Sequence, residues 1–103
     1  MDKTDITIAQ TILQQIGSRR FIVMTGASGF VGHKDGLAFR LPSRFATDGI
    51  NYIRIYLNPM DTYDLEFGKI WGAKYTQINK IDGVYVDDLR RIISETTGLA
   101  LSL

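Results

Sequence analysis

The side-chain pattern changes its period along the chain, and this change constrains the fold more than any other feature. Near both ends, apolar residues recur every three or four positions, as they do on one face of a helix. In the middle they alternate with polar residues, as in strands that bury one face of a sheet. The clearest alternation sets Ile53, Ile55 and Leu57 against Tyr52, Arg54 and Tyr56. The pattern therefore predicts a half-buried sheet between two terminal helices.

The two periods predict where these elements lie. The helical spacing predicts an N-terminal helix over residues 6–16 and a C-terminal helix over residues 86–97. The alternation predicts five short strands over residues 20–25, 37–41, 51–57, 62–70 and 74–81, the last ending at an Asp82-Gly83 turn. The connections between the strands are too short for helical crossovers, so the sheet should be mainly antiparallel. We predict an α+β fold of two layers, with one sheet face under the helices and the other exposed to solvent.

Size and composition narrow the classes of protein. A chain of 103 residues is expected to form a single α+β domain over residues 1–103, and its 45% hydrophobic content is enough for one core. A formal net charge of +1 excludes a polybasic arm, and the lack of cysteine excludes disulfides and thiolate zinc sites. No apolar run approaches the length of a membrane span, and the N-terminus does not resemble a secretory signal. We therefore expect a cytoplasmic protein with no membrane partner.

A glycine-rich string over residues 25–32, TGASGFVG, follows an apolar run. It resembles the dinucleotide-binding fingerprint of short-chain dehydrogenases, in which glycines bring a helix N-terminus close to a pyrophosphate. The helix that this chemistry needs is missing, because a strand pattern ending at Pro42 follows within ten residues of Gly32. We expect a flexible glycine loop over residues 26–36 and no cofactor.

Two carboxylates, Asp64 and Glu66, are two positions apart on a predicted strand and so share one face. Such a pair can hold Mg²⁺, as in metal-dependent nucleases. Those enzymes also place a lysine on the same side, whereas Lys69 falls on the opposite face of a regular strand. A solvated sheet face is the favoured interpretation, and no metal site or catalytic residue is predicted.

Tyrosine and arginine alternate on the predicted outward face. This combination suits protein interfaces, and it also suits single-stranded nucleic acid, whose bases stack on rings while guanidinium groups bind phosphates. It equally stabilises a sheet through cross-strand pairs. The candidate binding residues are Tyr52, Arg54, Tyr56, Arg40, Arg44 and Arg20.

Several segments together resemble a group of short uncharacterised proteins encoded by bacteriophages and other bacterial mobile elements. The segments are RFI at 20–22, MTGA at 24–27, FRLP at 39–42, GIN at 49–51, DTYDLEFGKI at 61–70 and TGL at 97–99. The resemblance implies a small stand-alone protein in the cytoplasm of a bacterial host cell. It implies no particular activity, and it favours binding modules over enzymes only by analogy of class.

The sequence therefore predicts a non-enzymatic binding module that presents the open sheet face and the glycine loop to a protein partner, a second copy of the chain included. The alternative is a protein that binds single-stranded nucleic acid through the same tyrosines and neighbouring arginines. A Mg²⁺-dependent phosphodiesterase built on Asp64 and Glu66 is a less favoured third hypothesis.

Overall fold

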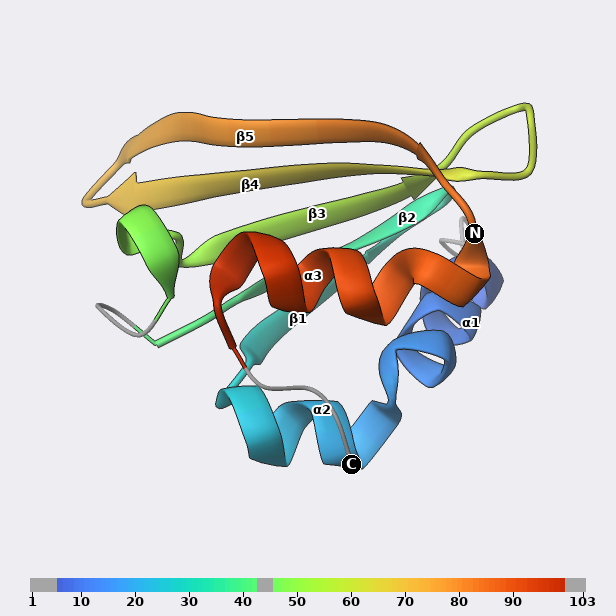
Figure 1. Ribbon diagram of the computed structural model, residues 1–103, viewed down its shortest axis with the longest axis horizontal. Helices are drawn as coiled ribbons and strands as arrows, with labels where there is room; N and C mark the ends of the chain where they lie inside the picture. The colour runs from blue at the N-terminus through green and yellow to red at the C-terminus, as the bar shows by residue number, and fades with distance from the viewer. Residues whose placement is uncertain (1–5, 43–45, 100–103) are drawn as a thin grey trace, which may run out of the picture.

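A computed structural model of the chain describes residues 6–42 and 46–99, and it confirms the predicted α+β fold. The described residues form a five-stranded sheet and three α-helices. Figure 1 shows the helices on one side of the sheet. The strands are β1 (Ser28–His33), β2 (Gly36–Arg40), β3 (Tyr52–Leu57), β4 (Tyr63–Trp71) and β5 (Lys74–Val84). The helices are α1 (Thr7–Ile16), α2 (Ser18–Thr25) and α3 (Leu89–Thr97), with short 3₁₀ turns η1 (Thr47–Gly49) and η2 (Val86–Asp88).

The sheet is an antiparallel meander in which each strand pairs with its neighbours in the sequence. The strand order β1-β2-β3-β4-β5 places β3 at the centre and leaves β1 and β5 as edges. Short connections between sequential strands enforce this antiparallel order. The prediction of a mainly antiparallel sheet is therefore confirmed.

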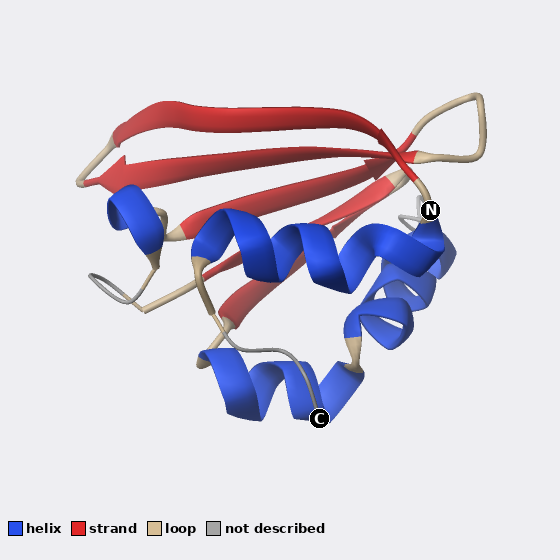
Figure 2. Cartoon of the chain, viewed as in Figure 1, coloured by secondary structure: helices blue, strands red, loops and turns tan. Residues whose placement is uncertain are grey.

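The core lies between the sheet and the helices, which all lie on the same side of the sheet (Figure 2). Alternate residues of the three central strands enter this core, and they are buried almost completely. The helices contribute Ile12, Ile16, Phe21, Leu89 and Ile93 from the other side. The sheet contributes Leu37, Phe39, Ile53, Ile55, Leu65 and Phe67. We call the sheet surface on the other side the open face.

The predicted strand over residues 20–25 is wrong, because this segment forms α2. Phe21 and Thr25 are one helical turn apart and both are buried, whereas Val23 is 75% exposed. The Thr25 hydroxyl donates to the Phe21 carbonyl, and Gly26 ends the helix in the left-handed conformation at φ 72°. The Phe21 ring meets the Phe39 ring edge to face at 5.3 Å, which fixes α2 against the sheet.

The expected glycine loop over residues 26–36 is also wrong, because most of it forms β1 and its turn into β2. Glycine serves here for close packing as well as for turning. A Cβ on Gly32 would lie 2.9 Å from Ile6 Cγ2 and 3.3 Å from Ala9 Cβ, so α1 approaches β1 at this position. The string TGASGFVG therefore crosses from the end of α2 into an edge strand, and no helix follows it.

The remaining strands lie close to their predicted positions, with one difference at the end of β5. The chain does not turn at Asp82-Gly83 but stays paired as far as Val84, opposite Tyr63. The pairing register shifts between Tyr63 and Leu65, and Gly83 takes a positive φ of 71° there. A bulge of this kind absorbs an extra residue without ending the strand.

Candidate functional site

The centre of the open face is built on β3. Tyr52, Arg54 and Tyr56 all lie on this face and are half-buried. In the sheet, Arg54 lies between Ala38 on β2 and Glu66 on β4. The predicted row of tyrosine and arginine therefore occupies the middle of the surface that the helices leave uncovered.

The Arg54 guanidinium is held mainly by aromatic rings. Its Cζ atom lies 5.4 Å from the centre of the Tyr52 ring and 5.3 Å from the centre of the Tyr75 ring. Arg54 Nη1 also lies 3.7 Å from Glu66 Oε1, which is an ion pair at long range. Because each of these contacts fixes the same planar group, the guanidinium has a defined position before any partner binds.

Tyr75, on β5, completes the cluster. Its ring meets the Tyr52 ring edge to face at 5.8 Å. It also covers Gly68, where an added Cβ would lie 2.6 Å from Tyr75 Cζ. We call Tyr52, Arg54, Glu66 and Tyr75 the Tyr-Arg cluster.

Burial changes the chemistry of the Tyr75 hydroxyl. Within the described part of the chain, the Tyr75 hydroxyl oxygen is buried and has no hydrogen-bond partner. Burial raises the pKa of this hydroxyl, the Glu66 carboxylate adds to the rise, and Arg54 opposes it. The pKa of Tyr56 is also raised, again first by burial. Both hydroxyls therefore stay neutral at physiological pH and can donate a hydrogen bond.

Tyr56 lies at the other end of the β3 row and covers a second glycine. An added Cβ on Gly36 would lie 2.5 Å from Tyr56 Cδ1, and the His33 ring lies 6.1 Å from the Tyr56 ring. The rings of Tyr56 and Tyr75 therefore each lie over a glycine, where an added Cβ would displace the ring. Glycine at positions 36 and 68 lets these two rings rest against the backbone.

The three other candidate residues have different positions. Arg40 lies on the open face, opposite Tyr52, and is exposed. Arg20 lies in α2, which belongs to the helical layer, so it does not join Tyr52 on the open face. Arg44 lies outside the described residues. Sequence reasoning missed Tyr75, whose only signal was a tyrosine near a strand glycine.

The charges on the open face are balanced. Its cations are Arg40, Arg54 and Lys80, and its anions are Asp64, Glu66 and Asp82. A surface that follows a nucleic-acid backbone needs an excess of positive charge. The open face has no such excess among the described residues.

The two carboxylates considered for Mg²⁺ have structural partners. Asp64 Oδ1 accepts hydrogen bonds from Asn58 Nδ2 at 2.9 Å and from the Gly83 amide at 3.1 Å. Glu66 pairs with Arg54. Across residues 6–42 and 46–99, no three His, Asp or Glu side chains gather closely enough to hold a metal ion.

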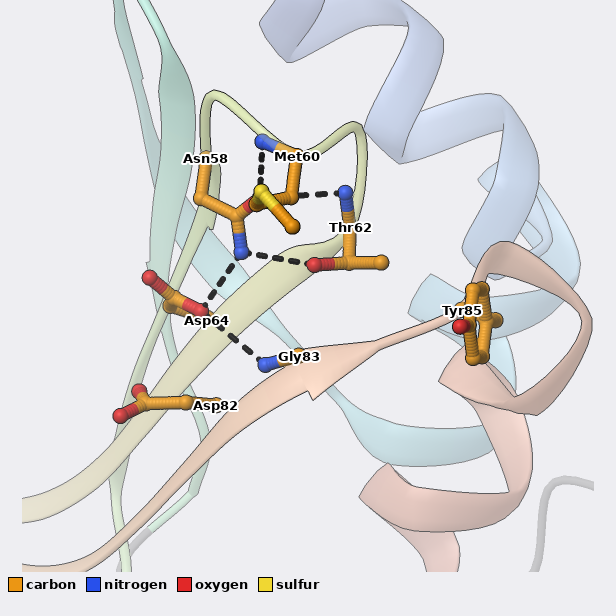
Figure 3. A pocket seen from close by; sticks show the side chains of 7 residues that line it. All are labelled: Asn58, Met60, Thr62, Asp64, Asp82, Gly83 and Tyr85. Atoms are coloured by element: carbon orange, nitrogen blue, oxygen red, sulfur yellow. Dashed lines mark hydrogen bonds between the residues drawn. The ribbon is translucent and has the colours of Figure 1, made fainter.

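A shallow pocket of about 440 Å³ lies beside Asp64, at the end of the sheet (Figure 3). Asn58 organises it: its Oδ1 accepts from the amides of Met60 and Thr62, and its Nδ2 donates to Thr62 Oγ1 and Asp64. Met60 and Tyr85 flank the opening and are 82% and 67% exposed. The hydrogen bonds drawn in Figure 3 hold the β3–β4 loop in shape, so the lining polar groups mostly satisfy one another.

Comparisons with known proteins identify no function for this surface. No protein-family model, curated protein or solved structure matches the chain. The resemblance to short bacteriophage proteins therefore stays a prediction. Among the described helices, none has the length and apolar character needed to cross a membrane.

Proposed function

We propose that the protein is a non-enzymatic binding module that engages a protein partner through the open face. The observation that carries this proposal is the Tyr-Arg cluster, which is half-buried at the centre of a sheet face that the helices do not cover. Tyrosine and arginine are enriched among the residues that contribute most to protein–protein binding. The cluster is therefore the centre of the proposed interface.

Pre-organisation supports the proposal. Binding costs free energy when side chains that were mobile become fixed. Arg54 is already fixed between Tyr52 and Tyr75, and Tyr56 and Tyr75 rest on glycines. A partner that binds this surface would have little further side-chain entropy to remove.

Charge balance favours a protein over a nucleic acid. Arg54 already pairs with Glu66, and acidic side chains lie beside the arginines on the same face. Phosphates would be repelled by these carboxylates, whereas a protein surface carrying both signs of charge could match them. The exposed apolar side chain of Val31, opposite Ala38 on this face, also suits a protein surface.

The proposal is tested by capture from a bacterial lysate, the setting that the resemblance implies. Wild-type protein, Tyr52→Ser/Tyr56→Ser and Arg40→Glu are immobilised, with Arg19→Ala/Arg20→Ala in α2 as the matched control. The captured protein is identified, purified and titrated by calorimetry. Both open-face variants should bind at least about tenfold more weakly while the α2 variant binds like wild type, a difference of about 1.4 kcal/mol or more.

Two outcomes would contradict the proposal. The first is a purified partner whose affinity is the same for wild type and for both open-face variants, with native circular dichroism throughout. The second is binding of labelled single-stranded DNA or RNA that weakens by orders of magnitude between about 50 and 200 mM salt. That second result would make the nucleic-acid hypothesis the better one.

A further inference from the structure

The outer edge of β5 is a second surface with a specific chemistry. β5 is 11 residues long and forms one edge of the sheet, and Figure 1 shows no described helix or strand outside it. Apart from Val84, its side chains are exposed or only partly buried. An edge of this length offers unpaired backbone groups to another strand. The opposite edge, β1, has only six residues, and both edge strands have register shifts against their neighbours.

The backbone direction along β5 identifies which residues face outward. Asn58 N donates to Thr62 O where β3 meets β4, so Asp64 and Glu66 direct their backbone groups to β3, and Leu65, between them, directs its own to β5. Ile81 is opposite Leu65 and therefore points its backbone groups into the sheet. Backbone groups alternate along a strand, and Lys80 and Asp82 therefore direct theirs toward the free edge. Their side chains lie on the open face, where Lys80 is opposite Glu66.

The order Lys80-Ile81-Asp82 is self-complementary. If a second β5 pairs antiparallel about a two-fold axis at Ile81, Lys80 of each copy lies directly opposite Asp82 of the other. Centring the axis on Lys80 or on Asp82 would place like charges opposite each other, which destabilises a strand pair. Charge thus favours an axis at Ile81 over an axis at either adjacent residue.

The side chains are free to form these pairs. Within one chain, Lys80 Nζ lies 3.9 Å from Asp82 Oδ1, and the two side chains are 48% and 63% exposed. An exposed ion pair at this distance contributes little and does not compete strongly with an intermolecular pair. On the helix side, Ile81 would meet its own copy and cover apolar surface that is now partly exposed.

We propose that the chain forms a symmetric homodimer through antiparallel pairing of β5 with β5 of a second copy, with Lys80 and Asp82 in reciprocal ion pairs. This joins two sheets edge to edge and sets the two open faces side by side on one surface. With the axis at Ile81, the pairing covers residues 78–84 of β5, so it does not include Tyr75, the residue of the Tyr-Arg cluster that lies on this strand. The dimer and the proposed function of the open face can therefore be tested separately, and the failure of one does not imply the failure of the other.

Charge reversal tests the register directly. K80D makes both positions acidic and D82K makes both basic, so each variant alone should dimerise at least about tenfold more weakly than wild type. The exchange K80D/D82K restores opposite charges and should dimerise like wild type. An equimolar mixture of K80D and D82K should form a heterodimer. Because both side chains are exposed, all variants should keep native circular dichroism.

Sedimentation velocity and mass spectrometry of the mixture give the readout. The proposal expects a species of twice the mass of the 103-residue chain for wild type and for the exchanged variant. It is overturned if wild type stays monomeric up to about 1 mM, the range of very weak association. It is also overturned if a dimer forms equally well with K80D, D82K and wild type, since the contact would then lie elsewhere.

Discussion

The Tyr75 ring lies over Gly68, and it can take this position on the open face because Gly68 has no side chain. An added Cβ at Gly68 would lie 2.6 Å from both Cζ and the hydroxyl oxygen of Tyr75. From β5, the ring thereby reaches across β4 to contact Tyr52 and Arg54 on β3. The position of Arg54 at the centre of the open face depends on this contact.

Gly68→Ala should therefore destabilise the protein, although alanine is ordinarily no worse than glycine in a strand. The new methyl group forces the Tyr75 ring off the sheet, at a cost of about 1 to 3 kcal/mol. Urea unfolding of Gly68→Ala, Tyr75→Ala and the double variant measures the coupling. In the Tyr75→Ala background the methyl group should cost almost nothing. An equal cost in both backgrounds would mean that the ring is not what the methyl group meets.

The Tyr75 hydroxyl should make stability fall at alkaline pH. Its folded pKa is raised, first by burial, so the unfolded chain loses this proton before the folded protein does. The contribution is intact below about pH 10, the ordinary tyrosine value, and is lost as the pH rises through the folded pKa. Tyr75→Phe should therefore make the alkaline fall in stability shallower.

At neutral pH the same change, Tyr75→Phe, should raise stability by about 1 kcal/mol, because it removes a buried hydroxyl with no partner among the described residues. Urea unfolding at both pH values measures the two effects together. A loss of stability at neutral pH would show that the hydroxyl has a hydrogen-bond partner in solution.

The ion pair between Arg54 and Glu66 should contribute less than the rings do. The atoms are 3.7 Å apart, and the two side chains remain 37% and 21% exposed, so water screens their attraction. A double-mutant cycle of Arg54→Met and Glu66→Gln should give a coupling free energy below about 1 kcal/mol. Coupling well above that value, with strong dependence on salt, would assign the position of Arg54 to Glu66 instead.

Asn58 should be the most sensitive residue of the β3–β4 loop. Asn58→Ala removes the acceptor for two backbone amides and both donors to Thr62 and Asp64, at a cost of about 2 to 3 kcal/mol. Asn58→Asp keeps the acceptor but places a carboxylate against Asp64. Thermal unfolding should therefore show a larger loss for Asn58→Asp at neutral pH than at about pH 4, where carboxylates begin to protonate.

The central strands could be predicted from the sequence because their two faces differ in polarity. Ile53 and Ile55 enter the core and Arg54 does not, so the alternation is visible in the residues themselves. The α2 segment could not be predicted in this way, since a short apolar run fits a strand or a helix equally well. Only the packing of Phe21 and Thr25 decides between them.

The edge strand β1 could not be predicted from the sequence for another reason. Its glycines carry no side chains, so no alternation can be seen, and Gly32 is used instead to admit α1. The candidate site was predictable as far as β3 is concerned. Tyr75 was not, because the register between β4 and β5 shifts after Phe67, and this shift depends on the pairing and not on local sequence.

The most direct test of the central claim is to map the partner's contact surface by nuclear magnetic resonance. Isotope-labelled protein is titrated with the partner purified after capture, and backbone amide and tyrosine ring signals are followed. The account predicts that the largest shifts fall on Tyr52, Arg54, Tyr56 and Tyr75, with little change in α2 and α3. Shifts concentrated on the helices, with the tyrosine rings unchanged, would contradict it.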